Sequence, residues 1–260
     1  MIISHKYKFV FIGLPFSASS AISKELHLQY EGAPYLRKHS LYHEFEKVAT
    51  KNEKEYFVFA LLRNPMEIVV TVYEKMKANS KGNFTNPDLF SENGGHITKK
   101  HREKFNFIHD NKASFQEYFL NFFIKPFDNF SSLTLDNCDF VIRYENIAED
   151  YILALEKSGV SNPKPLPVAN KTAGKKKDLS LYYSNEIKDR TIKVFGPFLS
   201  KYNYPFLESW GEVKVPLSSK LQFMILGFLR KVNQKYFKKL PNTTEIKGTI
   251  YGDMQRGKLN

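Results

Sequence analysis

The sequence predicts an α/β layer fold with a mostly parallel sheet, because short apolar runs alternate with segments of helical pattern. Residues 8–14 (KFVFIGL), 56–62 (YFVFALL) and 139–143 (DFVIR) are rich in aromatic and β-branched side chains. Apolar runs of this length are typical of strands that are buried on both faces. A helical segment follows each run, which is the strand–helix order of a parallel sheet.

The three predicted helices have recognisable starts. The first covers about residues 17–28, directly after the first strand. The second begins where Pro65 follows Asn64, a position suited to the first helical turn. Asn146 with Glu149 three residues later resembles a capping box, which predicts the start of the third helix.

Other helices and loops are expected between these units. Ser114 with Glu117 predicts a capped helix. Residues 80–97 are rich in Gly, Asn, Ser and Pro, so we expect a long surface loop there. Residues 161–178 hold three prolines and five lysines and predict a second loop.

Composition and charge limit the class of protein. The chain has 260 residues, and 39 Lys and Arg against 27 Asp and Glu give a formal net charge of +12. The single cysteine, Cys138, excludes a disulfide framework and a cysteine-ligated zinc cluster. The apolar run near the N-terminus is too short for a signal peptide or a membrane anchor, so we expect a cytoplasmic protein.

Trp210-Gly211 is predicted to close a catalytic domain of residues 1–210, which leaves 211–260 as a basic C-terminal extension. The extension holds ten basic and three acidic residues, so +7 of the net charge lies in it. A helix is expected over about 217–240, because apolar residues recur there at a spacing of three and four. These are Leu217, Leu221, Met224, Ile225, Phe228, Leu229 and Val232. Two interpretations stay open: contact with an anionic inner membrane surface, or packing on the catalytic domain or in a homo-oligomer.

The loop after the first strand, residues 13–20 (GLPFSASS), is the first candidate binding element. It joins a buried strand to a helix N-terminus and contains several small hydroxyl residues. Backbone N–H groups and the helix dipole at such a position favour phosphate binding. The Walker A pattern is absent, which disfavours ATP hydrolysis, and a plain structural turn is the alternative.

Arg63 is the second candidate, because it leaves the carboxyl end of the second strand, where ligands bind in open α/β sheets. Thr71 lies eight residues further on, about two helical turns along the following helix. An arginine with a hydroxyl can hold a phosphate by charge-assisted hydrogen bonds. The alternative is an arginine that only satisfies nearby carbonyl groups.

Four segments together make the chain resemble a known family. They are the loop 15–20, the segment 63–73 (RNPMEIVVTVY), residues 142–146 (IRYEN) and residues 170–172 (NKT). They occur in the order found in carbohydrate-type sulfotransferases, over about residues 8–210. The resemblance implies a P-loop-type three-layer fold, the donor 3′-phosphoadenosine 5′-phosphosulfate, a hydroxyl of a sugar or glycan as acceptor, and no metal.

The resemblance also implies roles for single residues. Arg63 and Thr71 would hold the 3′-phosphate of the donor. The loop would hold its 5′-phosphosulfate through Pro15, Phe16, Ser17, Ala18, Ser19 and Ser20. The family loop has a lysine at the position of Phe16, where it stabilises the leaving oxygen. We expect Lys171 to supply that charge, with Lys175, Lys176 and Lys177 as weaker candidates.

His39 is the predicted general base that takes the proton of the acceptor hydroxyl. It follows the first helix by a short connection, and neighbouring cations would keep its imidazole neutral. His43 and Glu44 are the alternates. Glu145 could act in catalysis or could hold Arg143 and the loop by an ion pair, and we favour the structural role.

The sequence therefore predicts a sulfotransferase. Its rival is a nucleotide-binding protein of the same fold that Phe16 has left catalytically weak. A nucleic-acid-binding protein is disfavoured, because the predicted strands are almost uncharged. A small-molecule kinase is disfavoured by the missing Walker lysine. A prokaryotic enzyme that acts on surface-polysaccharide or lipid-linked precursors is the corresponding expectation.

Overall fold

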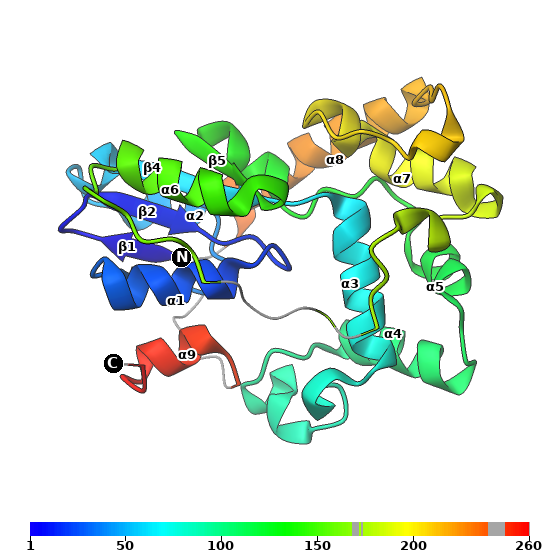
Figure 1. Ribbon diagram of the computed structural model, residues 1–260, viewed down its shortest axis with the longest axis horizontal. Coiled ribbons are helices and arrows are strands. Elements are labelled where there is room, and N and C mark those ends of the chain that lie inside the picture. The colour runs from blue at the N-terminus through cyan, green and yellow to red at the C-terminus, as the bar shows by residue number, and fades with distance from the viewer. Residues whose placement is uncertain (168–171, 173, 239–247, 260) are drawn as a thin grey trace. The chain divides into compact units, whose positions relative to one another are not determined.

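The computed structural model describes residues 1–167, 172, 174–238 and 248–259, in which the chain forms two compact units (Figure 1). The first unit contains residues 1–63, 129–170 and 230–260. The second contains residues 64–128 and 171–229. Because the segments of the two units alternate along the chain, the predicted boundary at residue 210 does not separate them.

The first unit is built on a five-stranded sheet with the order β3-β1-β2-β4-β5. The strands are β1 (Ile2–Ser4), β2 (Phe9–Ile12), β3 (Ala33–Pro34), β4 (Phe57–Leu62) and β5 (Phe140–Arg143). β2, β4 and β5 are parallel, with Phe9 opposite Phe57 and Phe59 opposite Phe140. β1 runs antiparallel to both β2 and β3. The sheet is therefore mixed, with the three strands that the sequence predicts forming its parallel part.

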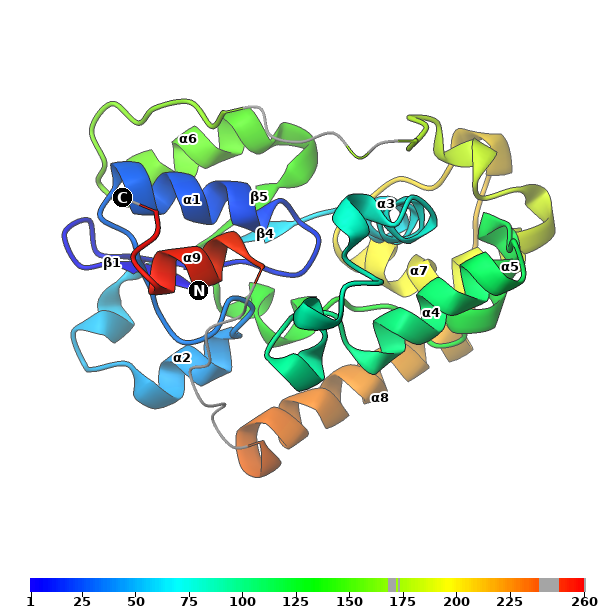
Figure 2. The ribbon, with the colours of Figure 1, turned by 90° about the horizontal axis from the view of Figure 1, so that it is seen from below.

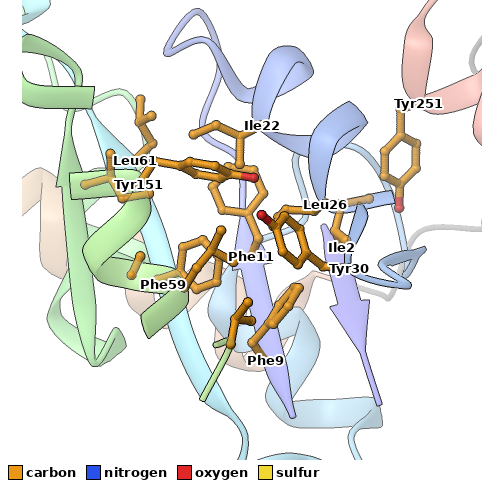
Figure 3. Packing of buried hydrophobic residues seen from close by; sticks show 14 of the residues in the cluster. Ile2, Phe9, Phe11, Ile22, Leu26, Tyr30, Phe59, Leu61, Tyr151 and Tyr251 are labelled. Carbon is orange, nitrogen blue, oxygen red and sulfur yellow. The ribbon is translucent and has the colours of Figure 1, made fainter. Parts of the chain in front are cut away.

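Side chains alternate between the two faces of this sheet, because successive residues of a strand point in opposite directions. Phe9, Phe11, Phe59 and Leu61 pack in one buried cluster with residues of three helices, and Figure 3 shows part of this cluster. Val10, Ile12, Val58 and Ala60 alternate with them and are buried as well. A sheet buried on both faces explains why its strands are continuous apolar runs.

Helices α1 (Ser19–Gln29), α2 (Tyr42–Val48), α6 (Ile147–Lys157) and α9 (Ile250–Gln255) belong to the first unit. Ile22 and Leu26 of α1 and Tyr151 of α6 contribute to the cluster in Figure 3. Tyr251 of α9 also packs in this cluster, although it lies close to the C-terminal end of the chain. Part of the predicted extension is thus core of the first unit.

The second unit is helical, with α3 (Pro65–Lys77), α4 (Lys99–Asp110), α5 (Phe115–Phe122) and α7 (Lys188–Lys201). α8 (Leu217–Val232) begins in this unit and ends in the first one, and a π-helical segment, Asn233–Phe237, follows it. The expected helix over 217–240 therefore continues as an α-helix only to Val232. Residues 239 and 240 lie outside the described residues.

The sequence patterns predicted to begin three of the helices are confirmed in two cases and wrong in one. Asn64 accepts a hydrogen bond from the backbone N–H of Met66, with Pro65 at the first position of α3, as predicted. Ser114 and Glu117 form the predicted capping box of α5. The capping box predicted at Asn146 is wrong. Residues 144–146 form a 3-10 turn there, and the side chain of Asn146 makes no capping hydrogen bond.

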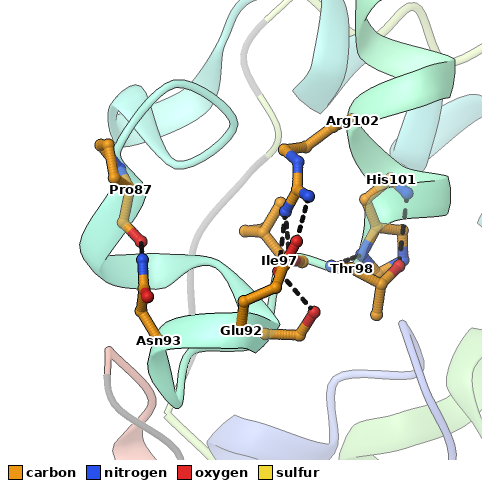
Figure 4. Close-up of polar contacts among 8 residues, drawn as sticks. Pro87, Glu92, Asn93, Ile97, Thr98, His101 and Arg102 are labelled. Carbon is orange, nitrogen blue, oxygen red and sulfur yellow. Dashed lines mark hydrogen bonds and ion pairs between the residues drawn. The ribbon is translucent and has the colours of Figure 1, made fainter.

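Residues 80–97 form the predicted surface loop, with three short 3-10 turns: Ser80–Gly82, Pro87–Leu89 and Ser91–Asn93. Figure 4 shows how its end is joined to α4. Arg102 of α4 forms an ion pair with Glu92, and its guanidinium carbon lies 4.2 Å from the ring centroid of Phe90. Thr98 and His101 cap the start of the helix. These contacts give the loop a defined path.

Candidate functional site

The candidate site lies in the first unit, at the carboxyl ends of its three parallel strands. Gly13 follows β2, Arg63 follows β4 and Tyr144 follows β5. Because Ile12 pairs with Ala60 and Leu62 pairs with Arg143, these strands end at the same edge of the sheet. Ligands of open α/β sheets bind at this edge.

Arg63, at the end of the central parallel strand, contacts the segments that follow both neighbouring strands. Its Nη1 donates a hydrogen bond of 3.1 Å to the backbone oxygen of Phe16. On the other side its guanidinium carbon lies 4.1 Å from the ring centroid of Tyr144, a cation–π contact. The side chain is buried. Since a guanidinium has five N–H donors, these contacts are compatible with a further anionic ligand.

The loop between β2 and α1 is compact. A Cβ atom at Gly13 would lie 2.6 Å from the Cβ of Ser19, so only glycine fits at the end of the strand. Buried Ser17 donates a hydrogen bond of 2.7 Å from its hydroxyl to the backbone oxygen of Leu14. This hydroxyl therefore holds the turn together. α1 then begins at Ser19, and the first N–H groups of an α-helix have no partner within the helix.

Two residues of this loop have a left-handed backbone conformation. Phe16 (φ 59°) and Ala18 (φ 60°) both adopt it, although neither is glycine. Asn129 (φ 48°) and Phe130 (φ 62°) do so as well, and the side-chain amide of Asn129 donates to the backbone oxygen of Pro15 at 3.1 Å. Non-glycine residues in this region store conformational strain, which is concentrated at functional sites of proteins.

His39 contacts the start of the same loop. Its Nδ1 lies 2.7 Å from the backbone oxygen of Gly13. Because a carbonyl oxygen only accepts, Nδ1 carries the proton, and Nε2 of the neutral ring is an acceptor. Burial, together with the charge of Lys38, lowers the pKa of His39 to about 3. The imidazole is therefore neutral near pH 7, in the tautomer that a proton acceptor needs.

The segment that carries His39 is fixed on both sides by Glu44. One oxygen of this buried carboxylate accepts a 2.9 Å hydrogen bond from Arg37, and the other accepts from the backbone N–H of Leu41 at 2.8 Å. Glu44 thus has a structural role around His39. His43, the other alternate base, lies 3.0 Å from Glu46 on the surface of α2.

The other predicted residues are found as follows. Thr71 is buried on α3, in the second unit. Lys171 lies outside the described residues. Lys175 forms an ion pair with Glu67 of α3, so its charge has a partner within the second unit. Glu145 is exposed, and the backbone N–H of Arg143 donates to Asp150 at 2.7 Å.

Two residues that shape this site were not among those predicted from the sequence. Tyr144 lies within the quoted 142–146 segment, but nothing in its pattern indicates that its ring packs on an arginine. Asn129 is 114 residues from its partner Pro15, so only the folded chain brings the two together. The hydroxyl-rich stretch that follows Asn129 is the sequence feature that could have drawn attention to this segment. Ser131 and Thr134 in it are buried, and their hydroxyls have no hydrogen-bond partner among the described residues.

Comparison of the chain with models of protein families, with curated proteins and with solved structures finds no match. In the described part of the chain, no group of three or more His, Cys, Asp or Glu side chains is arranged to hold a metal ion.

Proposed function

We propose that the protein is a sulfotransferase that moves a sulfuryl group from 3′-phosphoadenosine 5′-phosphosulfate to a hydroxyl of a sugar or glycan. The observation that supports it most is the position of Arg63, which joins the loop after β2 to the segment after β5. This places a buried cation beside a helix N-terminus at the ligand-binding edge of the sheet. A P-loop-type layer arrangement is part of the same proposal.

In this proposal the loop 15–20 holds the 5′-phosphosulfate through backbone N–H groups and serine hydroxyls. Arg63 binds the 3′-phosphate, with Thr71 as the second donor. Left-handed Phe16 and Ala18 support this assignment, because alternating backbone conformations turn successive N–H groups into an anion-binding concavity. The surrounding structure holds these strained conformations in place, so the loop already has the shape that the anion needs before it binds.

The chemical step needs few groups from the protein. The acceptor oxygen attacks sulfur and forms the new S–O bond, while the bond to the bridging oxygen breaks and 3′,5′-adenosine bisphosphate departs. Positioning and charge stabilisation carry most of the catalysis. Nε2 of His39 takes the acceptor's proton. A bound donor raises the pKa of this histidine from about 3 toward neutrality, because nearby negative charge favours the imidazolium.

A second candidate function is a nucleotide-binding protein of the same fold with little or no turnover. Phe16 supports it. The residue stands where the similar family has a lysine, its side chain is 41% exposed, and its backbone oxygen is already held by Arg63. Phenylalanine gives no hydrogen bond to a leaving oxygen. Lys171 is proposed to supply the missing charge in the enzyme. If Lys171 does not supply it, the protein would bind the donor without catalysing sulfuryl transfer.

Thermal-shift titration tests the donor class. 3′,5′-Adenosine bisphosphate at 100 times its Kd should stabilise the protein by about 2.7 kcal/mol, whereas 5′-AMP and ATP should stabilise it less at equal concentration. Arg63→Ala should weaken bisphosphate binding about tenfold or more, since a charge-assisted hydrogen bond contributes about 1.5–3 kcal/mol. Thr71→Ala should cost about 1 kcal/mol.

Arg256→Ala is the matched control, because this arginine of the first unit pairs with Asp253 on α9. It should leave bisphosphate affinity within twofold. Equal stabilisation by all three nucleotides would contradict the donor assignment. An Arg63→Ala variant that binds like the parent would remove Arg63 from the phosphate site. Bisphosphate binding without sulfuryl transfer to a panel of hydroxylated glycans would favour the second candidate function.

A further inference from the structure

Helix α8 exposes large apolar side chains over its whole length. Met224 is 66% and Phe228 is 65% exposed, and Leu217, Leu221, Ile225 and Leu229 are exposed as well. In the π-helical segment that follows, Tyr236 and Phe237 are also exposed. Figure 2 shows α8 in orange as a long continuous helix. Contiguous exposed apolar surface of this kind marks an interaction site.

The exposed apolar face is distinct from the face that packs on the protein. Ser219, Phe223 and Gly227 are the buried residues of α8, and they recur at a spacing of four. At about 100° per residue, they lie on the side opposite to Leu221, Ile225 and Phe228. The helix is therefore anchored through one face and presents its most apolar face outward.

The charged residues on and after α8 indicate what kind of surface its apolar face would bind. Between Glu212 and Glu245 the chain has no acidic residue. Lys220 and Lys231 are exposed and border the apolar face at one edge, and Lys235 and Lys238 follow in exposed positions. Lys231 lies 3.4 Å from Asp136 in a surface pair, which is worth little in water. An apolar face with lysines along one edge complements a membrane surface, which is apolar in its interior and anionic at its headgroups.

We propose that α8 docks the protein on an anionic lipid membrane and lies in the plane of the interface. Its apolar face would enter the boundary between headgroups and acyl chains, and its lysines would contact anionic headgroups. Among the described helices, none is both long and apolar enough to cross a bilayer. A second copy of the chain is a poorer occupant, because an antiparallel two-fold contact through this face would bring the two lysine borders together. The inference stands independently of the sulfotransferase proposal.

Co-sedimentation of the full chain with lipid vesicles tests this. We expect binding to vesicles of phosphatidylcholine with 30% phosphatidylglycerol and little binding to phosphatidylcholine alone. Each lysine near the surface contributes about fivefold to the partition coefficient, so Lys220→Gln with Lys231→Gln should reduce it about 25-fold. Raising the salt concentration should weaken binding in the same direction.

The apolar face is tested with Met224→Gln and Phe228→Gln in one variant. The matched control is Ile124→Gln, since Ile124 is also 66% exposed but lies outside α8. We expect the double variant to lose at least tenfold in vesicle binding, and the control to bind like the parent. Both should keep the parent's melting temperature and bisphosphate titration, which separates a docking defect from a folding or donor-site defect.

Equal binding to neutral and anionic vesicles, or no binding to either, would overturn the proposal. A concentration-dependent dimer seen by light scattering, and lost in the double variant, would assign the face to a second copy instead. A double variant that melts well below the parent would show that the face packs within the protein, which also contradicts the proposal.

Discussion

His39 combines three properties in one side chain: a fixed tautomer, a half-buried ring and a contact with the loop that follows β2. The hydrogen bond from its Nδ1 to Gly13 is a backbone contact that any structural histidine can make. The lowered pKa adds information, because the fold keeps this imidazole uncharged well below neutral pH. A neutral histidine beside a proposed anion site is suited to accept a proton only once negative charge has entered the site.

The lowered pKa has a consequence for stability. In the unfolded chain a histidine binds its proton near pH 6.5, whereas His39 in the folded protein binds it near pH 3. Between these values the unfolded state holds more protons, so the contribution of His39 to the free energy of unfolding is lost as the pH falls from about 6.5 to about 3. His39→Gln should flatten the urea-determined stability profile in this window. A profile with an unchanged slope would show that the imidazole is accessible to protons in the folded state.

Phe16 offers a second test at the residue scale. Its side chain is 41% exposed, so Phe16→Lys should change the free energy of unfolding by less than about 0.5 kcal/mol. A lysine at this position would face the anion that the loop is proposed to hold, and it should raise bisphosphate affinity several-fold by charge pairing. Phe16→Leu is the control without charge and should leave affinity unchanged. Equal affinities of the lysine and leucine variants would place the anion away from residue 16.

At the scale of elements, the loop between β2 and α1 shows where sequence pattern stops being informative. The strand before it, the helix after it and the N-cap region of α3 follow from local composition, because buried runs, proline and asparagine have local preferences. β1 and β3 were missed, since three and two residues carry too little pattern. The wrong capping box at Asn146 has a similar cause, because the backbone after β5 forms a 3-10 turn that no spacing rule anticipates.

The strain in this loop gives a prediction that separates stability from binding. Ala18, the N-cap residue of α1, has φ 60°, a conformation that glycine adopts without the Cβ penalty. Ala18→Gly should therefore raise the free energy of unfolding by about 0.5–1 kcal/mol, after the added freedom of the unfolded chain is deducted. It should also weaken bisphosphate binding, because the loop would no longer be held ready for the anion.

Ala21→Gly, at the third residue of the same helix, is the control for this prediction. Glycine in place of a helical alanine should lower the free energy of unfolding, by up to about 1 kcal/mol. Urea unfolding and bisphosphate titration of the two variants give both quantities. If Ala18→Gly destabilised the protein as Ala21→Gly does, the left-handed conformation at residue 18 would not be a source of strain.

At the scale of the whole molecule, each compact unit is formed by segments that lie far apart in the sequence. Local sequence patterns do not reveal the contacts that bring these segments together. The expected division at residue 210 rested on composition, which changes there toward basic residues. The first unit instead recruits α9 from the last residues of the chain, and Met254 and Tyr251 of that helix are buried with Ile22 and Leu26 of α1. Removing all of 211–260 would therefore remove core, and α8 has to be tested by substitution.

Tyr251 tests whether α9 is an integral part of the first unit. Its hydroxyl lies 2.8 Å from the backbone oxygen of Met1, 3.0 Å from that of Tyr35 and 3.1 Å from that of Leu36. It thus joins the C-terminal helix to β1 and to the segment that leads to His39. Tyr251→Phe keeps the buried ring and removes only the hydroxyl, so the free energy of unfolding should fall by about 1–3 kcal/mol.

Tyr236→Phe is the matched control, because Tyr236 is 68% exposed and its change should stay within about 0.5 kcal/mol. Amide hydrogen exchange locates the effect. In Tyr251→Phe, residues 33–41 should lose protection relative to the parent, since the carbonyl groups of Tyr35 and Leu36 lose their shared donor. The parallel strands should keep their protection, because β2, β4 and β5 pair without α9. A uniform loss over the whole first unit would instead mean that α9 stabilises the sheet as one cooperative body with the segment before His39.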